Sequence, residues 1–306
     1  DGIGKIEFNS NLAHLYAHFV RHTIDTSLEG LTIVYDGANG AASSVGPEIL
    51  SGLGAKVINI NVNPDGLNIN HHCGSTHIEG LQVAVQQHNA DLGIANDGDA
   101  DRCLLVDEKG QVLDGDQIML LCALKLKEEG KLKGDTIVGT VMSNIGFHKA
   151  AEELGMKTVS TAVGDRYVLE YMREHNLSIG GEQSGHVIFL DHNTTGDGML
   201  TAVQVAALMK EKKQPLSELA GIMTKYPQVL VNVRVATKTG WEDNDLIKAA
   251  IVTAEGELGD EGRVLVRASG TEPLIRVMAE GPDQETLQSL CEEIADIIGR
   301  EQGLAE

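Results

Sequence analysis

The sequence predicts an α/β protein with two consecutive α/β three-layer domains, each built on a mixed sheet, followed by a small α+β domain. Short apolar segments with strand character alternate with helical segments over most of the chain. After Pro227 the pattern changes to a strand with valine at every second position. Because 306 residues are enough for two or three domains, we expect domains at residues 1–113, 114–224 and 227–306.

The first predicted domain contains an amphipathic helix and a βαβ unit. Gly54 is expected to end its second helix, because glycine is favoured just after a helix. The expected elements are, in order, helix 12–24, strand 31–35, a glycine turn at 36–40, a helix that ends near Leu53, strand 57–60, helix 78–88, and strands 91–96 and 103–106.

The second predicted domain repeats the alternation of helix and strand, and the third combines three strands with two helices. Valine recurs at every second position from Val229 to Val235, as expected for a half-buried strand. For the second domain we expect helices 116–129, 146–154 and 198–210, a helix opening at the turn 163–166, and strands 136–141, 157–161 and 187–190. For the third we expect strands 229–235, 264–267 and 274–279 and helices 245–258 and 284–300.

Charge and composition exclude several classes of partner. Lys and Arg total 24 and Asp and Glu total 45, so the formal net charge is −21. This balance argues against a nucleic acid or an anionic membrane as partner, whereas a small anionic substrate needs only a local basic pocket. Four scattered cysteines, and no signal peptide or long apolar run, predict a cytoplasmic protein with buried, reduced thiols. The sequence does not define an oligomeric state, and a homodimer is compatible with it.

The most informative segment is DGDADR at residues 97–102, in which Asp97, Asp99 and Asp101 alternate with other residues. It lies between two apolar segments that we expect to be buried strands. Three carboxylates at this spacing repel one another unless a cation neutralises them. Mg²⁺ and Ca²⁺ take carboxylate oxygens as ligands, so the loop is a candidate metal site. A solvated acidic turn is the alternative.

An EF-hand calcium loop in this position would begin at Asp97 and end at Glu108. Its sixth position requires glycine for a sharp turn, but Arg102 stands there, and apolar residues with strand character follow. We therefore reject an EF-hand. Arg102 can either screen the carboxylates or reach an anionic ligand.

A second polar loop, GGEQSGH at residues 180–186, combines three glycines with four hydrogen-bonding side chains. Glycine lets a backbone approach a ligand closely. Glu182 and Ser184 can bind sugar hydroxyls, and His186 can donate to a phosphate or act as an acid or base. A polar turn with satisfied side chains is the alternative.

A third loop, RASGTEP at residues 267–273, ends in proline and is followed by Arg276. The backbone amides around Gly270, the hydroxyls of Ser269 and Thr271 and the guanidinium make a candidate anion cradle. Arginine suits phosphate because its planar fork binds two oxygens at once. The alternative is a hairpin with surface arginines, which such a density of donors in an acidic protein disfavours.

Two further turns are open to more than one interpretation. Arg166 lies where a helix is expected to begin, and a helix N-terminus favours anions. An exposed arginine paired with Asp165 is an equally good interpretation. The turn at 36–41 lacks the full G-x-G-x-x-G pattern and the acidic residue about twenty positions later that dinucleotide binding requires, so we interpret it as structural.

In their order along the chain, the loops at 97–102, 181–186 and 267–273 resemble the motifs of the α-D-phosphohexomutase superfamily, whose members interconvert sugar 1-phosphates and 6-phosphates. Segments 163–168 and 181–186 are most similar to bacterial phosphoglucosamine mutases. The resemblance runs over nearly the whole chain. It implies Mg²⁺ as cofactor and a hexosamine phosphate as substrate, with phosphomannomutase or phosphoglucomutase activity as the alternative.

The resemblance also implies a role for each site residue. Ala100 stands where phosphoglucosamine mutases usually have glycine, a substitution that related mutases tolerate. The implied metal ligands are Asp97, Asp99 and Asp101; the implied catalytic residues are Arg102, beside the transferred phosphate, and His186, near the reacting end of the sugar. The implied substrate-binding residues are Arg166, Glu182, Ser184, His186, Arg267, Ser269, Gly270, Thr271 and Arg276, of which the last five would hold the non-reacting phosphate.

One part of the family pattern is missing from these 306 residues. The superfamily works through a phosphoserine in a loop resembling Thr-Ala-Ser-His-Asn-Pro, in an N-terminal domain that precedes the metal loop. The chain matches the second, third and fourth of four family domains. We therefore expect a fragment whose partner is the N-terminal domain of its parent chain and which is inactive alone. A metal-dependent phosphatase and a non-catalytic sugar-phosphate binding module are the alternatives.

Overall fold

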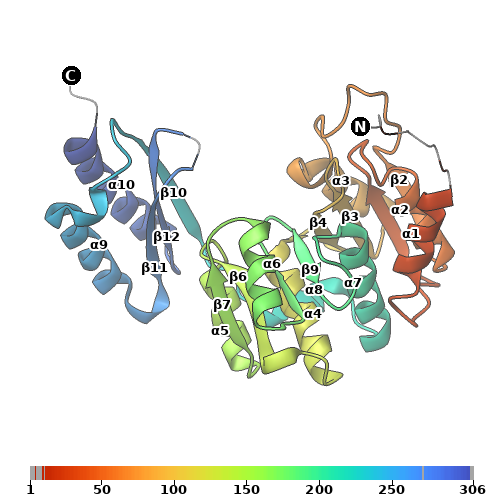
Figure 1. The fold of residues 1–306 in the computed structure, drawn as a ribbon. Helices are drawn as coiled ribbons and strands as arrows, with labels where there is room; N and C mark the ends of the chain where they lie inside the picture. Colours follow the sequence, from red (N-terminus) through yellow and green to blue (C-terminus); the bar gives the residue numbers. More distant parts are fainter. Residues whose placement is uncertain (1–3, 5–8, 10, 271, 304–306) are drawn as a thin grey trace. The chain divides into compact units, whose positions relative to one another are not determined.

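The structure is a computed structural model that describes residues 4, 9, 11–270 and 272–303. The chain divides into two compact units, each with its own core (Figure 1). Unit 1 comprises residues 1–143 and 147–223, and unit 2 comprises residues 144–146 and 224–306. The predicted boundary between residues 113 and 114 falls inside unit 1 and stays a prediction.

Unit 1 contains two mixed sheets, as the sequence predicts. The first has the order β2-β1-β3-β4-β5, in which β2, β1 and β3 are parallel and the last two strands are antiparallel. The second has the order β7-β6-β8-β9, in which only the edge strand β9 is antiparallel. The strands are β1 (Thr32–Asp36), β2 (Lys56–Ile60), β3 (Leu92–Asn96), β4 (Cys103–Asp107), β5 (Val112–Leu113), β6 (Thr136–Thr140), β7 (Lys157–Thr161), β8 (Ile179–Gly181) and β9 (Val187–Phe189).

Helices cover both faces of these sheets, because successive strand residues point to opposite faces. On β6, Ile137 faces the large core that includes Phe147 of α5, whereas Val138 packs with Val168 and Met172 of α6. The helices of this part of the chain are α1 (Asn11–Arg21), α2 (Val45–Gly52), α3 (Glu79–His88), α4 (Gly115–Glu128), α5 (Ile145–Glu153), α6 (Asp165–Glu174), α7 (Gly198–Lys212) and α8 (Leu216–Leu219).

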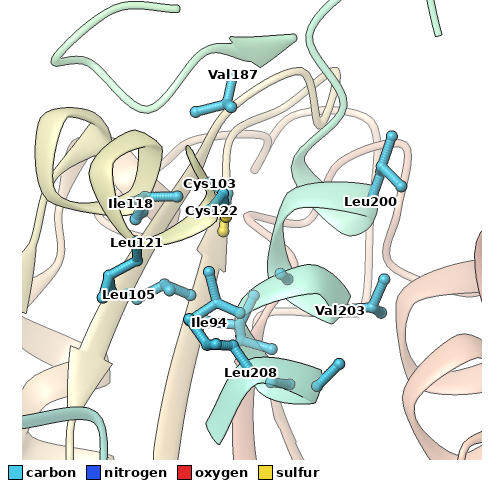
Figure 2. Close-up of a cluster of buried hydrophobic side chains, with 14 of the residues drawn as sticks. Ile94, Cys103, Leu105, Ile118, Leu121, Cys122, Val187, Leu200, Val203 and Leu208 are labelled. Atoms are coloured by element: carbon cyan, nitrogen blue, oxygen red, sulfur yellow. The ribbon is translucent and has the colours of Figure 1, made fainter. Parts of the chain in front are cut away.

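The main core of unit 1 lies where the first sheet meets α4 and α7 (Figure 2). Side chains from three sources fill it: Ile94, Cys103 and Leu105 from β3 and β4; Ile118, Leu121 and Cys122 from α4; and Leu200, Val203 and Leu208 from α7. Val187 of β9 joins the same cluster, so the core extends from the first sheet to the second. The two helices are fixed at their N-termini by Asp114, which forms a capping box with Gln117, and by Asp197.

Unit 2 is a three-stranded antiparallel sheet of order β10-β12-β11 with two helices packed on it. Its elements are β10 (Gln228–Arg234), α9 (Asp245–Leu258), β11 (Arg263–Ala268), β12 (Leu274–Glu280) and α10 (Gln284–Gln302). The valine alternation predicted on β10 is confirmed: Val229 and Val235 are buried, and the two valines between them pack against the same core. Unit 2 therefore has the predicted α+β character.

A buried carboxylate explains why residues 144–146 group with unit 2. Glu280 is fully buried at the end of β12. It accepts hydrogen bonds from Asn144 Nδ2 at 3.3 Å, from the Ile145 amide at 2.9 Å and from Arg263 Nε at 2.7 Å. Paired in this way, a buried charge is tolerated.

The predicted elements are confirmed with small shifts at their ends. The first helix ends at Arg21 rather than at residue 24, where the Thr23 amide donates to the Val20 carbonyl in place of the i−4 carbonyl of a continuing α-helix. Gly54 follows α2 with a φ of +95°, which glycine adopts without strain. The short elements β5, β8 and α8 were not predicted, since two to four residues carry no readable periodicity.

The cysteine prediction is confirmed: all four thiols are free and buried. Among the described residues, every helix is too short or too polar to cross a membrane.

Candidate active site

The acidic loop joins β3 to β4, and it brings its three aspartates together. Oxygens of Asp97, Asp99 and Asp101 all lie within 4.8 Å of one another. Asp97 is buried, Asp101 is half-buried and Asp99 is exposed, so the cluster lines the edge of the protein rather than its core. This geometry is what a shared cation requires.

Backbone contacts fix the shape of this loop. Fully buried Asn96 donates from Nδ2 to the Arg102 carbonyl at 2.7 Å and accepts from the Tyr35 hydroxyl at 3.0 Å. The Gly198 amide donates to the Ala100 carbonyl at 2.9 Å. Ala100 itself has a φ of +63°, in the left-handed region that favours glycine. These hydrogen bonds hold the loop in one conformation, in which the backbone of Ala100 is strained.

The electrostatics of the loop favour a cation. Burial raises the pKa of Asp97, and the negative charges of Asp101 and Asp99 raise it further. Arg102 Nε lies 3.7 Å from Asp97 Oδ2 and 3.9 Å from Asp101 Oδ1, too far for a hydrogen bond. Asp101 Oδ1 is buried and has no hydrogen-bond partner among the described residues. A buried oxygen without a donor in an acidic cluster fits a hard divalent cation.

The predicted sugar loop lies beside the acidic loop. The Cys103 amide of β4 donates to the Gly185 carbonyl at 2.9 Å, and residues 102 and 186 form an isolated antiparallel bridge. The loop closes on itself, because the Gly185 amide donates to the Glu182 carbonyl at 3.0 Å. The first turn of α4 supports it from behind: the Gly115 amide donates to the Gln183 carbonyl at 3.0 Å.

A cavity of about 370 Å³ opens between these loops. It brings together three residues that the sequence predicted for the site, Arg102, Glu182 and Ser184. Its other lining residues are Thr140, Met142, Val163 and Gln183. Glu182 Oε1 accepts from the Gly164 amide at 2.9 Å, which orients the carboxylate at the cavity wall. The cavity combines a cation, a carboxylate and a hydroxyl, the donor and acceptor set of a sugar phosphate site.

Arg166 does not line this cavity in the structure. It is exposed on α6, and its Nε donates to Glu170 Oε1 at 2.7 Å, one turn along the helix. Arg166 is exposed and paired with a carboxylate, as one of the two sequence interpretations expected, but the carboxylate is that of Glu170 and not that of Asp165. Its predicted contact with substrate stays a prediction.

His186 is almost completely buried, with 4% of its side chain exposed. Nδ1 lies 3.1 Å from Asp101 Oδ2, and Nε2 lies 3.1 Å from the Gly196 amide. Both ring nitrogens therefore face protein groups.

A second cavity, of about 530 Å³, flanks the acidic loop. It includes Asp99 and Asp101 together with residues that the sequence reasoning did not assign to a site: Tyr16 of α1, and Asn193, Thr195, Gly196 and Asp197 before α7. The Gly-Asp-Gly sequence at 196–198, placed just before a predicted helix, was the available signal, since Asp is a preferred helix N-cap.

The predicted anion cradle forms a site of its own in unit 2. Arg267 on β11 and Arg276 on β12 are directly opposite each other in the antiparallel register. Burial lowers the pKa of Arg267, and the charge of Arg276 lowers it further. Arg276 Nε is buried without a hydrogen-bond partner among the described residues. Arg276 Nη2 donates to Glu272 Oε2 at 3.0 Å, so Arg267 and the unused Nε of Arg276 are the groups that favour a bound anion.

The loop that joins these strands is held by its own hydrogen bonds. Buried Ser269 accepts at Oγ from the Glu272 amide at 3.3 Å, and Lys238 Nζ donates to the Ser269 carbonyl at 2.7 Å. Lys238 adds a cation that the sequence reasoning missed. Gly270 is exposed at the tip, and Thr271 lies outside the described residues.

Comparisons with known proteins agree with this fold. Three family models match: the phosphoglucomutase/phosphomannomutase alpha/beta/alpha domain II over residues 12–110, domain III of the same kind over 114–226, and the C-terminal domain over 230–297. The chain belongs to the phosphohexomutase superfamily.

Its relatives include bacterial proteins named phosphoglucosamine mutase. The protein of Geobacillus thermodenitrificans is 54% identical over 289 residues, which are 94% of this chain and 64% of the relative. The protein of Geobacillus kaustophilus is 51% identical over 304 residues, 99% of this chain and 68% of the relative. The chain thus spans about two thirds of the length of these relatives.

Solved structures show the same fold at lower identity. A phosphoglucomutase/phosphomannomutase family protein of Burkholderia thailandensis matches with a TM-score of 0.78 at 23% identity, covering 94% of this chain and 64% of its own. An Aspergillus fumigatus N-acetylphosphoglucosamine mutase, solved in complex with GlcNAc-6P and magnesium, matches with a TM-score of 0.74 at 23% identity, covering 92% of this chain and 68% of its own.

Proposed function

We propose that this chain is the metal-holding and sugar-phosphate-binding part of a phosphoglucosamine mutase, which interconverts glucosamine 6-phosphate and glucosamine 1-phosphate. The observation that carries the proposal is the aspartate triad beside a cavity that contains Arg102, Glu182 and Ser184. Relatives of that name at 51–57% identity support it. The chain spans about two thirds of those relatives, so the interconversion is proposed for a protein that also contains their N-terminal part.

The donor set of the acidic loop fits Mg²⁺. Asp97, Asp99 and Asp101 supply three carboxylates, and the hydrogen-bond-free Asp101 Oδ1 needs a positive partner. When bound, Mg²⁺ would offset the negative charge of the phosphoryl group that is transferred. Arg102, 41% exposed at its side chain, lies at the cavity wall and would contact the same phosphoryl oxygens.

The other groups of the cavity would select and orient the sugar. The Glu182 carboxylate can accept two hydroxyl hydrogen bonds or bind the amino group of glucosamine, and Ser184 can donate or accept one. In unit 2, Arg267, Ser269 and Arg276 would hold the phosphate that is not transferred. Phosphoryl transfer needs such positioning and charge neutralisation more than covalent chemistry by the protein.

The covalent step would need a phosphoserine from the N-terminal part of the parent. Its phosphoryl group would pass to the free hydroxyl of the sugar monophosphate, forming a bisphosphorylated sugar and a free serine. The sugar would then return its other phosphoryl group to that serine. The 306 residues contain no matching serine loop, so we propose that this chain binds the substrate but does not convert it.

Phosphorus-31 NMR tests the proposal directly. Glucosamine 6-phosphate titrated with the chain and Mg²⁺ should show binding that weakens at least tenfold in Asp99→Asn or Arg102→Met. No glucosamine 1-phosphate should form. Conversion by the chain alone would refute the inactive-fragment proposal, and release of inorganic phosphate would favour a phosphatase. Tighter binding of mannose or glucose phosphates would instead favour phosphomannomutase or phosphoglucomutase activity in the parent.

A further inference from the structure

The contacts of His186 define which ring nitrogen carries the proton. The Gly196 amide is a donor only, so Nε2, 3.1 Å away, must accept its hydrogen bond. The proton of the neutral ring then lies on Nδ1, which donates to Asp101 Oδ2 at 3.1 Å. Asp165 Oδ2 lies 3.8 Å from Nε2, beyond hydrogen-bond distance, and its side chain is 58% exposed.

Gly196 is required at its position by the imidazole ring. A Cβ atom added to Gly196 would lie 2.4 Å from His186 Nε2 and 2.5 Å from Cε1, so any larger residue would displace the ring. The backbone of Gly196 therefore packs directly on His186. This contact explains why the amide can reach Nε2 at all.

The segment that carries Gly196 is itself anchored. Asp197, the N-cap of α7, accepts from the Leu200 amide at 2.9 Å. It also accepts from the Tyr16 hydroxyl at 2.7 Å and from Asn193 Nδ2 at 3.3 Å. Next along the chain, the Gly198 amide donates to Ala100 within the acidic loop. The start of α7 thus contacts the acidic loop at two points, one through His186 and one through the backbone.

We propose that His186 and segment 193–198 form a positioning device for the metal ligand Asp101. The Nδ1 proton holds Oδ2 and leaves Oδ1 as the oxygen that faces the cation. In this role His186 acts through Asp101, as a positioning residue. The inference rests on the proposed function only in that the acidic loop binds a divalent cation. Partners that orient a carboxylate ligand typically contribute 10- to 100-fold to metal affinity.

Two conservative variants separate the two hydrogen bonds of the ring. In His186→Asn the amide nitrogen lies near the position of Nδ1 and can still donate to Asp101. In His186→Gln the amide group lies near the position of Nε2 and keeps only the Gly196 contact. We expect Mn²⁺ affinity, measured by electron paramagnetic resonance on the whole chain, to fall at least tenfold in H186Q and H186A and less than threefold in H186N. His88→Asn, an exposed residue of α3, is the control and should not change it.

A measurement on the metal-free chain tests the same geometry independently. NMR of histidine labelled with ¹⁵N and ¹³C should show the neutral Nδ1–H tautomer for His186, assigned as the signal absent from H186Q. Gly196→Ala should shift that signal and weaken Mn²⁺ binding, and circular dichroism checks that each variant is folded. Equal Mn²⁺ affinity in H186N and H186Q, or an Nε2–H tautomer, would overturn the inference. Failure of the proposed function is distinguishable, because the unchanged chain would then bind no Mn²⁺.

Discussion

Gly115→Ala measures how tightly the sugar loop is held against the first turn of α4. A Cβ atom added at Gly115 would lie 2.0 Å from the Glu182 carbonyl oxygen and 2.8 Å from the Gly185 amide nitrogen. Ordinary contact begins near 3.4 Å, so loop and helix must separate by about 1.4 Å. The atoms that must move are backbone, which cannot turn aside as a flexible side chain can.

Two effects of opposite sign decide the magnitude. Alanine is favoured over glycine in a helix by about 0.5–1 kcal/mol, whereas forcing extra atoms into a packed site costs about 1–3 kcal/mol. We therefore expect Gly115→Ala to destabilise unit 1 by about 1–2 kcal/mol. Gly80→Ala is the matched control: Gly80 also lies in the first turn of a unit 1 helix, α3, and an added Cβ would meet nothing within 4 Å. It should stabilise by about 0.5–1 kcal/mol.

Thermal unfolding followed by circular dichroism distinguishes the two variants. At about 2–4 °C per kcal/mol, their melting temperatures should differ by several degrees in opposite directions from the unchanged chain. The single tryptophan, Trp241, lies in the core of unit 2, so its fluorescence identifies the transition of that unit and allows the shift to be assigned to unit 1. A Gly115→Ala chain as stable as Gly80→Ala would refute the close packing of the sugar loop on α4.

Three further outcomes follow from other contacts. Ala100→Gly should raise the free energy of unfolding by up to about 1 kcal/mol, because it removes an alanine from the left-handed region, and it should leave Mn²⁺ affinity unchanged. A loss of stability in thermal unfolding would contradict backbone strain at Ala100. Burial raises the pKa of Cys122 to about 12 and that of Cys291 to about 11. At pH 8 Ellman's reagent should therefore react with none of the four buried thiols in the folded chain and with all four in the unfolded chain. Fast reaction in the folded chain would contradict this expectation. Arg267→Met should stabilise anion-free unit 2 by about 0.2–1 kcal/mol, because it relieves the repulsion from Arg276. Inorganic phosphate should raise the temperature of the Trp241 transition in the unchanged chain and not in this variant; an equal rise in both would refute the cradle.

The sequence predicted most of the fold because local signals agreed with one another. The alternation on β10 places Val229 and Val235 in the core, and the alternating helices and strands of unit 1 define two mixed sheets. Helix starts were readable where a capping residue precedes an apolar segment, as Asp114 does for α4. Local patterns suffice for such elements, since each is determined by residues close in sequence.

The composition of the site was predictable, but its geometry was not. The sequence indicated Asp101 and His186 as members of two separate loops, 85 residues apart, and gave no sign that one binds the other. The ion pair of Arg166 with Glu170 was predictable from the i, i+4 spacing, whereas its contact with a phosphate stays a prediction.

The close approach of the two loops in unit 1 follows from strand pairing at the boundary between the sheets. The bridge between Arg102 and His186 lies where β4 begins and where the sugar loop ends, so the backbone that carries the metal ligands is paired with the backbone that carries the sugar ligands. One core contains Leu105 of β4 and Val187 of β9 (Figure 2), the two strands that follow these loops in the sequence. A shift of either sheet would therefore displace metal and sugar ligands together, and the distance between them is determined by the packing of unit 1 rather than by either loop alone.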